Sequence, residues 1–562
     1  MTAPVRLGVV MLCHEELALA ARMARLWARG GAQVMVHVDA RAPAAPVDAL
    51  RADLADLAGQ VHLAPRVACE WGRFSLVRAT QIAAERLLAL DPDISHVLLV
   101  SGACLPLRPV GEICAYLAAR PGCDFIESVT VGDAGWTVGG LSEERFTLRF
   151  PFSYRRQRWL FDRHVELQRR LRFRRRIPQG LVPHLGSQWW CLTCASLQAI
   201  LNDPRRAEFD RYFRRVWIPD ESYFQSLIRR HARQIESRSL TFSRFDAQGR
   251  PFLFYDDHLT LLEQSRCFLV RKVWRGAQRL HEHFPRPATT PDAEPRPQRL
   301  ERMIDQAVQR RCQGRPGLYM QSRFPVKDRE IVKTAAPYAV LQGFSDLFAD
   351  FPNWLGARLD ADVHGHLFAS DGIGFAGGAA LGPGAFPDNP AMRDLDPRGF
   401  LASLVRLTPR MQVWQHSPRD NQALAWFMAT DPHARMFLIT GAWAVPLMHS
   451  GMPFDDIRRM AARLQRAELA QIEAVRSVWC KAQVQVWDLA DFCARPLGVL
   501  QSVLRELGAG TDAATDLPAM RPVAGMGDFL QRLRNAGLRP QLMGDFPITG
   551  AGGAAARERS AP

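Results

Sequence analysis

The stretch Trp217-Ile-Pro-Asp-Glu-Ser-Tyr-Phe-Gln-Ser-Leu227 places a proline and two carboxylates directly before an apolar run. This pattern predicts a loop that turns into a helix, with Asp220 at the position that caps it. Glu221 would then lie at the mouth of a cleft, near the positive end of the helix, where it could act as a general base. A pair of carboxylates that merely starts a helix is the alternative interpretation.

The chain of 562 residues is too long for one ordinary hydrophobic core, so at least two domains are expected. Its hydrophobic content of 47% and charged content of 23% are typical of a globular protein. The first residues lack the charged leader and cleavage site of a signal peptide, which predicts a cytoplasmic location. The net charge of +15 favours an anionic partner and leaves nucleic acid, a lipid surface and a phosphorylated substrate open.

Strand-like and helix-like segments alternate from Val5 to about Thr130. The strand-like segments are Val5–Leu12, Gln33–Val38, Val61–Leu63, His96–Ser101 and Asp124–Glu127, and the helix-like segments are Glu15–Arg29, Val47–Leu57 and Arg73–Leu90. This alternation predicts an α/β domain with a mainly parallel sheet and helices on both faces. Ligands of such sheets bind beyond the carboxyl ends of the strands. No glycine-rich dinucleotide or P-loop motif follows the first strand.

Arginines alternate with aromatic residues and leucines between Tyr154 and Arg176, in a segment that is expected to be helical. A lipid headgroup surface fits this composition, and a solvated insertion that faces the substrate fits it equally. Nucleic acid is a third candidate. Because no recognised nucleic-acid module accompanies the segment, we expect no nucleic-acid partner. A peripheral contact with the inner membrane face through residues 154–176 stays open.

Seven short motifs follow one another over about residues 1–280. They are His37-Val-Asp39, Glu70-Trp-Gly72, Leu99-Val-Ser-Gly-Ala-Cys-Leu-Pro-Leu107, Phe125-Ile-Glu127, Gly186-Ser-Gln-Trp-Trp190, Pro219-Asp-Glu-Ser-Tyr-Phe224 and Phe268-Leu-Val-Arg-Lys272. In this order they resemble one glycosyltransferase family, that of the core-2/I-branching β-1,6-N-acetylglucosaminyltransferases and the peptide xylosyltransferases. The resemblance implies a GT-A-type fold, a UDP-sugar donor, and inversion at the anomeric carbon without a metal ion.

The resemblance also implies roles in the transfer step. Glu221 matches the base that takes the proton of the acceptor hydroxyl. Lys272 matches the lysine that stabilises the leaving diphosphate in place of a metal ion, and Arg271 flanks it. The family's second arginine has no match in the strand that should carry it. Arg238 or Arg244 would take that role, or the role is lost.

The donor site is expected to bind uridine and no metal. His37 and Asp39 end the second strand, where the family binds uridine; a strand-terminal aspartate that caps the next turn is the alternative. Two Asp-x-Asp sequences occur, but Asp91-Pro-Asp93 precedes a strand and Asp360-Ala-Asp362 lies outside the matched region. We therefore expect no cofactor, and the UDP-sugar acts as a co-substrate.

The acceptor sugar is expected to lie near Glu127 and either Trp189 or Trp190. Aromatic rings stack on sugar faces and carboxylates bind sugar hydroxyls, but buried core tryptophans are the alternative. Ser187 could contact the donor or the acceptor, or it could satisfy backbone groups.

The second half of the chain is separated by a proline-rich linker at 285–298, after a transferase domain at 1–284. We expect a second α/β domain at 299–548 and a disordered tail at 549–562. Val486-Trp-Asp-Leu489 and Arg495-Pro-Leu-Gly-Val-Leu500 faintly resemble the tail of sulfotransferase domains. Because no glycine-rich phosphate loop opens this domain, a degenerate, non-catalytic relative or an unrelated fold is expected.

The sequence therefore predicts an inverting glycosyltransferase that moves N-acetylglucosamine or xylose from UDP to a hydroxyl of a glycan or lipid-linked acceptor, as in polysaccharide biosynthesis. Transfer to a protein serine, the reaction of the peptide xylosyltransferases, is the alternative within the same class. A non-catalytic module that binds a nucleotide sugar or a glycan is the alternative of another class, because the matching arginine is missing.

Overall fold

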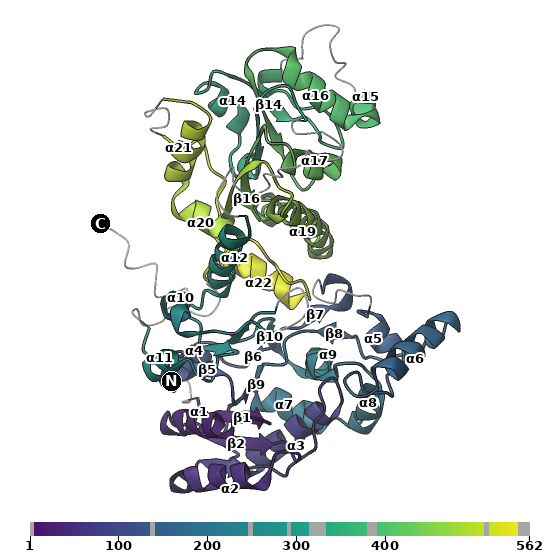
Figure 1. The fold of residues 1–562 in the computed structure, drawn as a ribbon, viewed down its shortest axis with the longest axis vertical. Coiled ribbons are helices and arrows are strands. Elements are labelled where there is room, and N and C mark those ends of the chain that lie inside the picture. Colours follow the sequence, from purple (N-terminus) through teal and green to yellow (C-terminus); the bar gives the residue numbers. More distant parts are fainter. Residues whose placement is uncertain are drawn as a thin grey trace, which may run out of the picture. The chain divides into compact units, whose positions relative to one another are not determined.

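The computed structural model describes residues 5–134, 141–245, 251–288, 294–313, 333–378, 390–510 and 516–548 (Figure 1). The chain forms two compact units. Unit 1 comprises Met1–Leu300, Leu530–Arg539 and Ile548–Pro562, and unit 2 comprises Glu301–Phe529 and Pro540–Pro547. The sequence did not predict that Leu530–Arg539 belongs to unit 1. The predicted tail at 549–562 lies outside the described residues.

Unit 1 is built on a seven-stranded sheet in the order β10-β6-β9-β4-β1-β2-β3. The strands are β1 (Leu7–Cys13), β2 (Gln33–Val38), β3 (Val61–Leu63), β4 (His96–Ser101), β6 (Cys123–Phe125), β9 (Cys191–Thr193) and β10 (Gln234–Glu236). Only β9 runs antiparallel to its neighbours, β4 and β6, among these strands. The prediction of a mainly parallel sheet is confirmed.

Two smaller sheets and a set of helices complete unit 1 (Figure 1). The smaller sheets are β11 (Thr241–Ser243), β12 (Leu269–Arg271) and β5 (Leu105–Pro106), and β7 (Val129–Thr130) with β8 (His184–Leu185). The helices are α1 (Leu17–Arg29), α2 (Ala44–Asp53), α3 (Ser75–Leu90), α4 (Val110–Ala118), α5 (Glu144–Thr147), α6 (Arg158–Arg170), α7 (Cys194–Leu201), α8 (Arg206–Phe213), α9 (Tyr223–His231), α10 (Leu259–Ser265) and α11 (Gln278–His283). α12 (Pro297–Gln313) follows, and it continues into unit 2.

The centre of the large sheet follows directly from apolar strand sequences. Every residue of β1 is buried, which requires cover on both faces of the strand. One predicted helix is shifted: instead of Val47–Leu57, α2 begins at Ala44 and a separate 3₁₀ turn follows at Ala55–Leu57. The prediction started the helix after Pro46, but proline is tolerated in the first helical turn because the N–H groups there lack helical partners.

The strand order places a switch point at the middle of this sheet. β2, the next strand along the chain, lies on one side of β1, and β4 lies on the other side. The connections leave the carboxyl ends of β1 and β4 in opposite directions, which opens a crevice where α/β sheets bind their ligands.

Unit 2 contains a five-stranded sheet in the order β14-β15-β13-β16-β17, with every described pair parallel. The strands are β13 (Tyr338–Gln342), β14 (Ala361–His366), β15 (Met411–His416), β16 (Ala434–Thr440) and β17 (Gln483–Asp488). The helices are α13 (Phe344–Leu347), α14 (Phe351–Gly356), α15 (Pro390–Leu395), α16 (Pro397–Leu407), α17 (Ala425–Ala429), α18 (Ala444–Met448), α19 (Phe454–Arg476), α20 (Leu489–Ala494) and α21 (Pro496–Glu506); α22 (Met526–Asn535) begins in unit 2 and ends in unit 1. The predicted likeness of this region to sulfotransferases stays a prediction.

The described parts of the predicted linker at 285–298 are bound to unit 1. The backbone N–H of Arg286 donates to the carbonyl of Leu107 at 3.0 Å. The N–H of Ala288 donates to the carboxylate of Glu112, also at 3.0 Å. None of the described helices has both the length and the apolar composition needed to cross a bilayer.

Gly186, between β8 and β9, lets two segments of unit 1 approach closely. A Cβ atom at this position would overlap with the backbone carbonyl of Glu127. We predict that Gly186→Ala lowers the free energy of unfolding by roughly 1–3 kcal/mol or more, because backbone cannot move aside cheaply. Thermal unfolding of the full chain measures this.

Gly111→Ala is the matched control, because a Cβ on this glycine of α4 meets no atom within 4 Å. Alanine is favoured over glycine in a helix, so the control should unfold at the same or a slightly higher temperature. An equal loss of stability in both variants would contradict the prediction.

Candidate functional site

A cavity of about 210 Å³ lies at the carboxyl ends of β1 and β4. Its lining includes His14, Glu15, Ser101, Gly102, Arg271 and Lys272. The switch point of the sheet therefore coincides with a cavity that carries two cationic side chains.

β12 brings Arg271 and Lys272 to this cavity. The Nε of Arg271 donates to the Ser101 hydroxyl at 3.2 Å, and its guanidinium carbon lies 4.4 Å from the ring centre of Trp189. The ammonium of Lys272 lies 3.2 Å from the carboxylate of Glu15, which is 55% exposed. Exposed ion pairs of this kind contribute little, so an anionic ligand can compete with Glu15 for Lys272.

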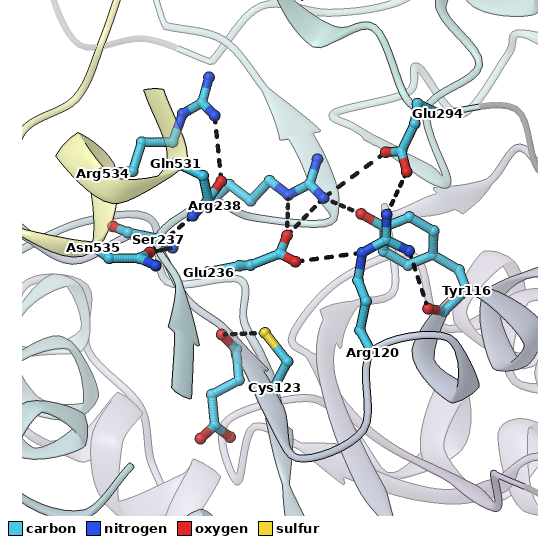
Figure 2. A network of polar contacts seen from close by, with 11 residues as sticks. Tyr116, Arg120, Cys123, Glu236, Ser237, Arg238, Glu294, Gln531, Arg534 and Asn535 are labelled. Carbon is cyan, nitrogen blue, oxygen red and sulfur yellow. Dashed lines mark hydrogen bonds and ion pairs between the residues drawn. The ribbon is translucent and has the colours of Figure 1, made fainter. Parts of the chain in front are cut away.

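The two candidates for the missing arginine lie in different surroundings. Arg238, after β10, donates through Nε and Nη2 to Glu236 at 2.9 and 2.7 Å and also to the Tyr116 hydroxyl. Figure 2 shows it inside a network of polar contacts, and it does not line the cavity. Arg244 follows β11, whose last residue Ser243 is in register with Arg271. Neither Arg238 nor Arg244 lines the cavity, so the arginine that partners Lys272 stays a prediction.

The two residues predicted to bind uridine are both buried. His37 is 1% exposed, and its Nε2 accepts a hydrogen bond from the Val67 N–H at 3.0 Å. Burial lowers the pKa of His37, which favours the neutral ring. Its position supports a role in holding the backbone at Val67. Asp39 accepts from the Arg41 N–H at 2.8 Å, and its own N–H donates to the carbonyl of Cys13 at the end of β1.

Glu221 ends a 3₁₀ turn, Pro219–Glu221, and its side chain is 31% exposed. The Nη1 of Arg145, on α5, lies 3.2 Å from its Oε2. Arg145 is itself held by the carbonyl of Leu141 at 3.1 Å and by the ring of Trp217. Burial raises the pKa of Glu221, Arg145 opposes this rise, and Glu127 adds to it. Arg145 therefore favours the ionised form that a general base requires.

The predicted capping role of Asp220 is wrong. α9 begins at Tyr223 with Ser222 at the N-cap position and without a side-chain cap bond. Asp220 is 8% exposed, and its buried Oδ1 has no hydrogen-bond partner among the described residues. Burial, with the charge of Glu221, raises the pKa of Asp220 to about 7, against the opposing charges of Arg145 and Arg271. The charge of Asp220 thus interacts with that of Arg145, which pairs with Glu221, and with that of Arg271, which lines the cavity.

Glu127 and Ser187, two of the residues predicted to contact a substrate, lie in contact with each other. One oxygen of Glu127 accepts the Ser187 N–H at 2.9 Å. Its other oxygen lies 2.9 Å from the Nε of Arg539, which the sequence did not predict. The Ser187 hydroxyl accepts from the Trp189 N–H at 3.3 Å, which links Glu127 to the tryptophan beside Arg271.

Both predicted tryptophans are buried. Trp190 is fully buried, and the centre of its ring lies 5.0 Å from that of Phe224. It is therefore a core tryptophan, which was the alternative to a role in stacking on a sugar. Trp189 presents a ring face to Arg271. Trp71, in the motif Glu70-Trp-Gly72, is exposed and lies edge-on to Trp217, the ring that also contacts Arg145. Trp71 is therefore an exposed aromatic residue whose neighbour Trp217 contacts Arg145, and no role was predicted for it.

The Asp-x-Asp sequences form ion pairs with arginines. Asp91 lies 2.7 Å from Arg6, and Asp362 lies 3.2 Å from Arg410. Within the described ranges, no group of three or more histidine, cysteine, aspartate and glutamate side chains is arranged to hold a metal ion.

Two family models match this chain. Residues 10–260 match the core-2/I-branching enzymes. The N-terminal region is a core-2/I-branching enzyme domain. This family implies a glycosyltransferase, with a sugar donor and an acceptor as substrates. Residues 271–562 match a family of unknown function (DUF5927), to which the chain therefore also belongs. Comparison with curated proteins gives no match.

The branching-enzyme match contains Glu127, Arg145, Asp220 and Glu221, whereas the second match begins at Arg271. Arg271, Lys272 and Arg539 thus belong to the region of unknown function by sequence and to unit 1 by structure. The candidate site is assembled from both matched regions.

We predict that Asp220 makes stability depend on pH. Between pH 4 and 7 the folded chain holds a proton on Asp220 that the unfolded chain has lost, because folding raises this pKa to about 7. The stabilisation is complete below the unfolded pKa and is lost as pH rises through 7. Relative to the wild type, Asp220→Asn should gain on the order of a few kcal/mol between pH 4 and 8.

Urea unfolding at a series of pH values measures this difference. Asp48→Asn is the control, because Asp48 lies on α2 with 67% of its side chain exposed. Its difference from the wild type should not change with pH. A difference for Asp220→Asn that is constant over this range would show the prediction to be wrong.

Proposed function

We propose that the branching-enzyme domain is an inverting, metal-independent transferase of GT-A type. It moves N-acetylglucosamine or xylose from UDP to a hydroxyl of a glycan or lipid-linked acceptor. The observation that carries the proposal is the cavity at the switch point, lined by Arg271 and Lys272; the charges of both Arg271 and Glu221 act on Asp220. This arrangement supplies cations that can bind a diphosphate and a carboxylate that can accept the proton of a hydroxyl group.

The transfer is a single displacement. The acceptor oxygen attacks the anomeric carbon and gives its proton to the carboxylate of Glu221. The bond from that carbon to the diphosphate oxygen breaks on the opposite face, and its electron pair leaves with UDP. Arg271 and Lys272 stabilise the charge that develops on the diphosphate. Arg244, which follows the strand paired with β12, would add a third positive charge.

Glu221→Gln should slow transfer strongly, because an amide cannot accept the proton. We expect the rate of UDP release in the presence of acceptor to fall about 10²- to 10⁴-fold across a panel of UDP-sugars. Glu143→Gln is the control, since Glu143 lies near α5 with 70% of its side chain exposed. Its rate should equal that of the wild type.

The same assay tests the alternatives. A non-catalytic binding module releases no UDP in the wild type but still binds UDP-sugars in calorimetry. Transfer to serine peptides and not to glycans would favour the protein xylosyltransferase alternative. Activity retained in EDTA supports the metal-independent step, and activity lost in EDTA and restored by a divalent ion would overturn it.

We also propose that residues 154–176 contact an anionic membrane surface. Large apolar side chains on or next to α6 are exposed: Trp159 (67%), Leu160 (36%), Leu167 (52%) and Leu171 (70%). The spacing of the three leucines places them on one side of the helix. Phe161 and Val165 pack inward against Leu148 and Phe150. α6 therefore has a second apolar stripe that this unit does not bury.

Exposed arginines flank the stripe, among them Arg155, Arg156, Arg163, Arg170 and Arg174. Each basic residue near an anionic leaflet adds about 1 kcal/mol of attraction, and inserted leucines add apolar burial. This composition favours a lipid surface, where a lipid-linked acceptor would be found.

We predict that the full chain floats with vesicles that contain anionic lipid at low salt, and that Leu167→Glu with Leu171→Glu prevents flotation. The control is Leu90→Glu, because Leu90 ends α3 and is 55% exposed. It should float as the wild type does. A wild-type protein that stays in the soluble fraction would contradict the membrane contact.

A further inference from the structure

The segment Leu530–Arg539 is built into unit 1 although it follows most of unit 2 in the sequence. Figure 2 shows the end of α22 (yellow) beside the segment that follows β10. The side-chain oxygen of Asn535 accepts the Ser237 N–H at 3.2 Å, and the Asn535 carbonyl accepts from the guanidinium of Arg229. Leu533 and Leu538 are fully or almost fully buried.

The next turn docks on the small sheet of β7 and β8. The carbonyl of Gly537 accepts the Thr130 N–H at 3.0 Å. Gly537 has a φ of 83°, and a Cβ at this position would lie 2.7 Å from a methyl carbon of Thr130. Glycine is therefore required both by the left-handed backbone and by the close approach. Two residues later, this turn delivers Arg539 to Glu127.

Glu127 is held from two sides. The Nε of Arg539 lies 2.9 Å from one carboxylate oxygen, and the Ser187 N–H donates to the other at 2.9 Å. The side chain of Glu127 is 15% exposed. A largely buried carboxylate needs such partners to stay ionised and in one orientation.

We propose that Arg539 is a positioning residue for the acceptor: it fixes Glu127, and with it the Ser187 loop, in the orientation that presents an acceptor hydroxyl to Glu221. This inference rests on the proposed transferase function. It gives the region of unknown function a defined part in the site, since Arg539 belongs to that region by sequence.

The charged groups around Glu221 predict how the pH dependence of activity changes when Arg539 is replaced. Arg145, Asp220 and Glu127 are the charged or titratable groups that act on Glu221 or are coupled to it. Arg539 offsets the charge of Glu127. When Arg539 is removed, the uncompensated charge of Glu127 raises the pKa of Glu221 further. A larger fraction of Glu221 is then protonated at a given pH, so activity requires a higher pH.

The experiment uses the full chain with Arg539→Gln, Arg539→Lys and the control Arg534→Gln. Arg534 lies on the same segment and donates to Gln531 at 3.3 Å. For Arg539→Gln we expect kcat/KM for the acceptor to fall roughly ten- to hundredfold with the donor KM unchanged. The acidic limb of the pH profile moves to higher pH. Arg539→Lys keeps the positive charge, so it should restore part of kcat/KM for the acceptor and part of the wild-type pH profile. Arg534→Gln should behave as the wild type.

A double-mutant cycle with Glu127→Gln distinguishes an effect of Arg539 that acts through Glu127 from a general effect on the stability of the fold. If Arg539 acts through Glu127, the second substitution adds little once the first is present. Additive effects, an unmoved pH profile, or equal changes in donor and acceptor KM would overturn the inference while leaving the transferase function intact. A wild-type protein without transfer to any acceptor would overturn both. Thermal unfolding of each variant identifies a general loss of folding.

Discussion

Three carboxyl groups, those of Glu127, Asp220 and Glu221, act on one another in the candidate site, and arginines from separate segments must offset their charges. Arg145 comes from α5, Arg271 from β12 and Arg539 from the segment after α22. Carboxylates taken out of water repel one another strongly, so Asp220, which has no ion pair with any described residue, is the group that binds a proton most readily. The ionisation of these carboxyl groups therefore depends on the complete fold of unit 1.

The sequence predicted the part of this arrangement that local patterns determine. Apolar runs such as Leu7–Cys13 become central strands because both of their faces must be covered, and their carboxyl ends then meet at one edge of the sheet. Glu127, Ser187 and Glu221 were identified from short motifs that follow strands or precede a helix. The structure brings Glu127 and Ser187 into contact and couples Glu127 to Glu221.

The features of the site that were not predicted from the sequence depend on contacts between residues far apart in the chain. Arg145 pairs with a carboxylate far along the chain and carries no local pattern that would mark it among 72 basic residues. The same holds for Arg539. Asp220 was misread because Asp220 and Ser222 are both common capping residues, and only the break between the 3₁₀ turn and α9 distinguishes them. Arg238 and Arg244 were equivalent candidates in the sequence; the structure pairs Arg238 with Glu236, and neither arginine lines the cavity.

The division of the site between two matched regions bears on what the second region contributes. The carboxyl groups Glu127, Asp220 and Glu221, with Arg145, lie in the branching-enzyme match at 10–260. Arg271, Lys272 and Arg539 lie in the match at 271–562. The first region alone would contain the three carboxyl groups but, of the arginines that act on them, only Arg145. It would also lack Arg271 and Lys272, the cations at the cavity. Since charge balance in a partly buried site sets both protonation and ligand binding, the region of unknown function is a structural part of the candidate site rather than an appendage to it.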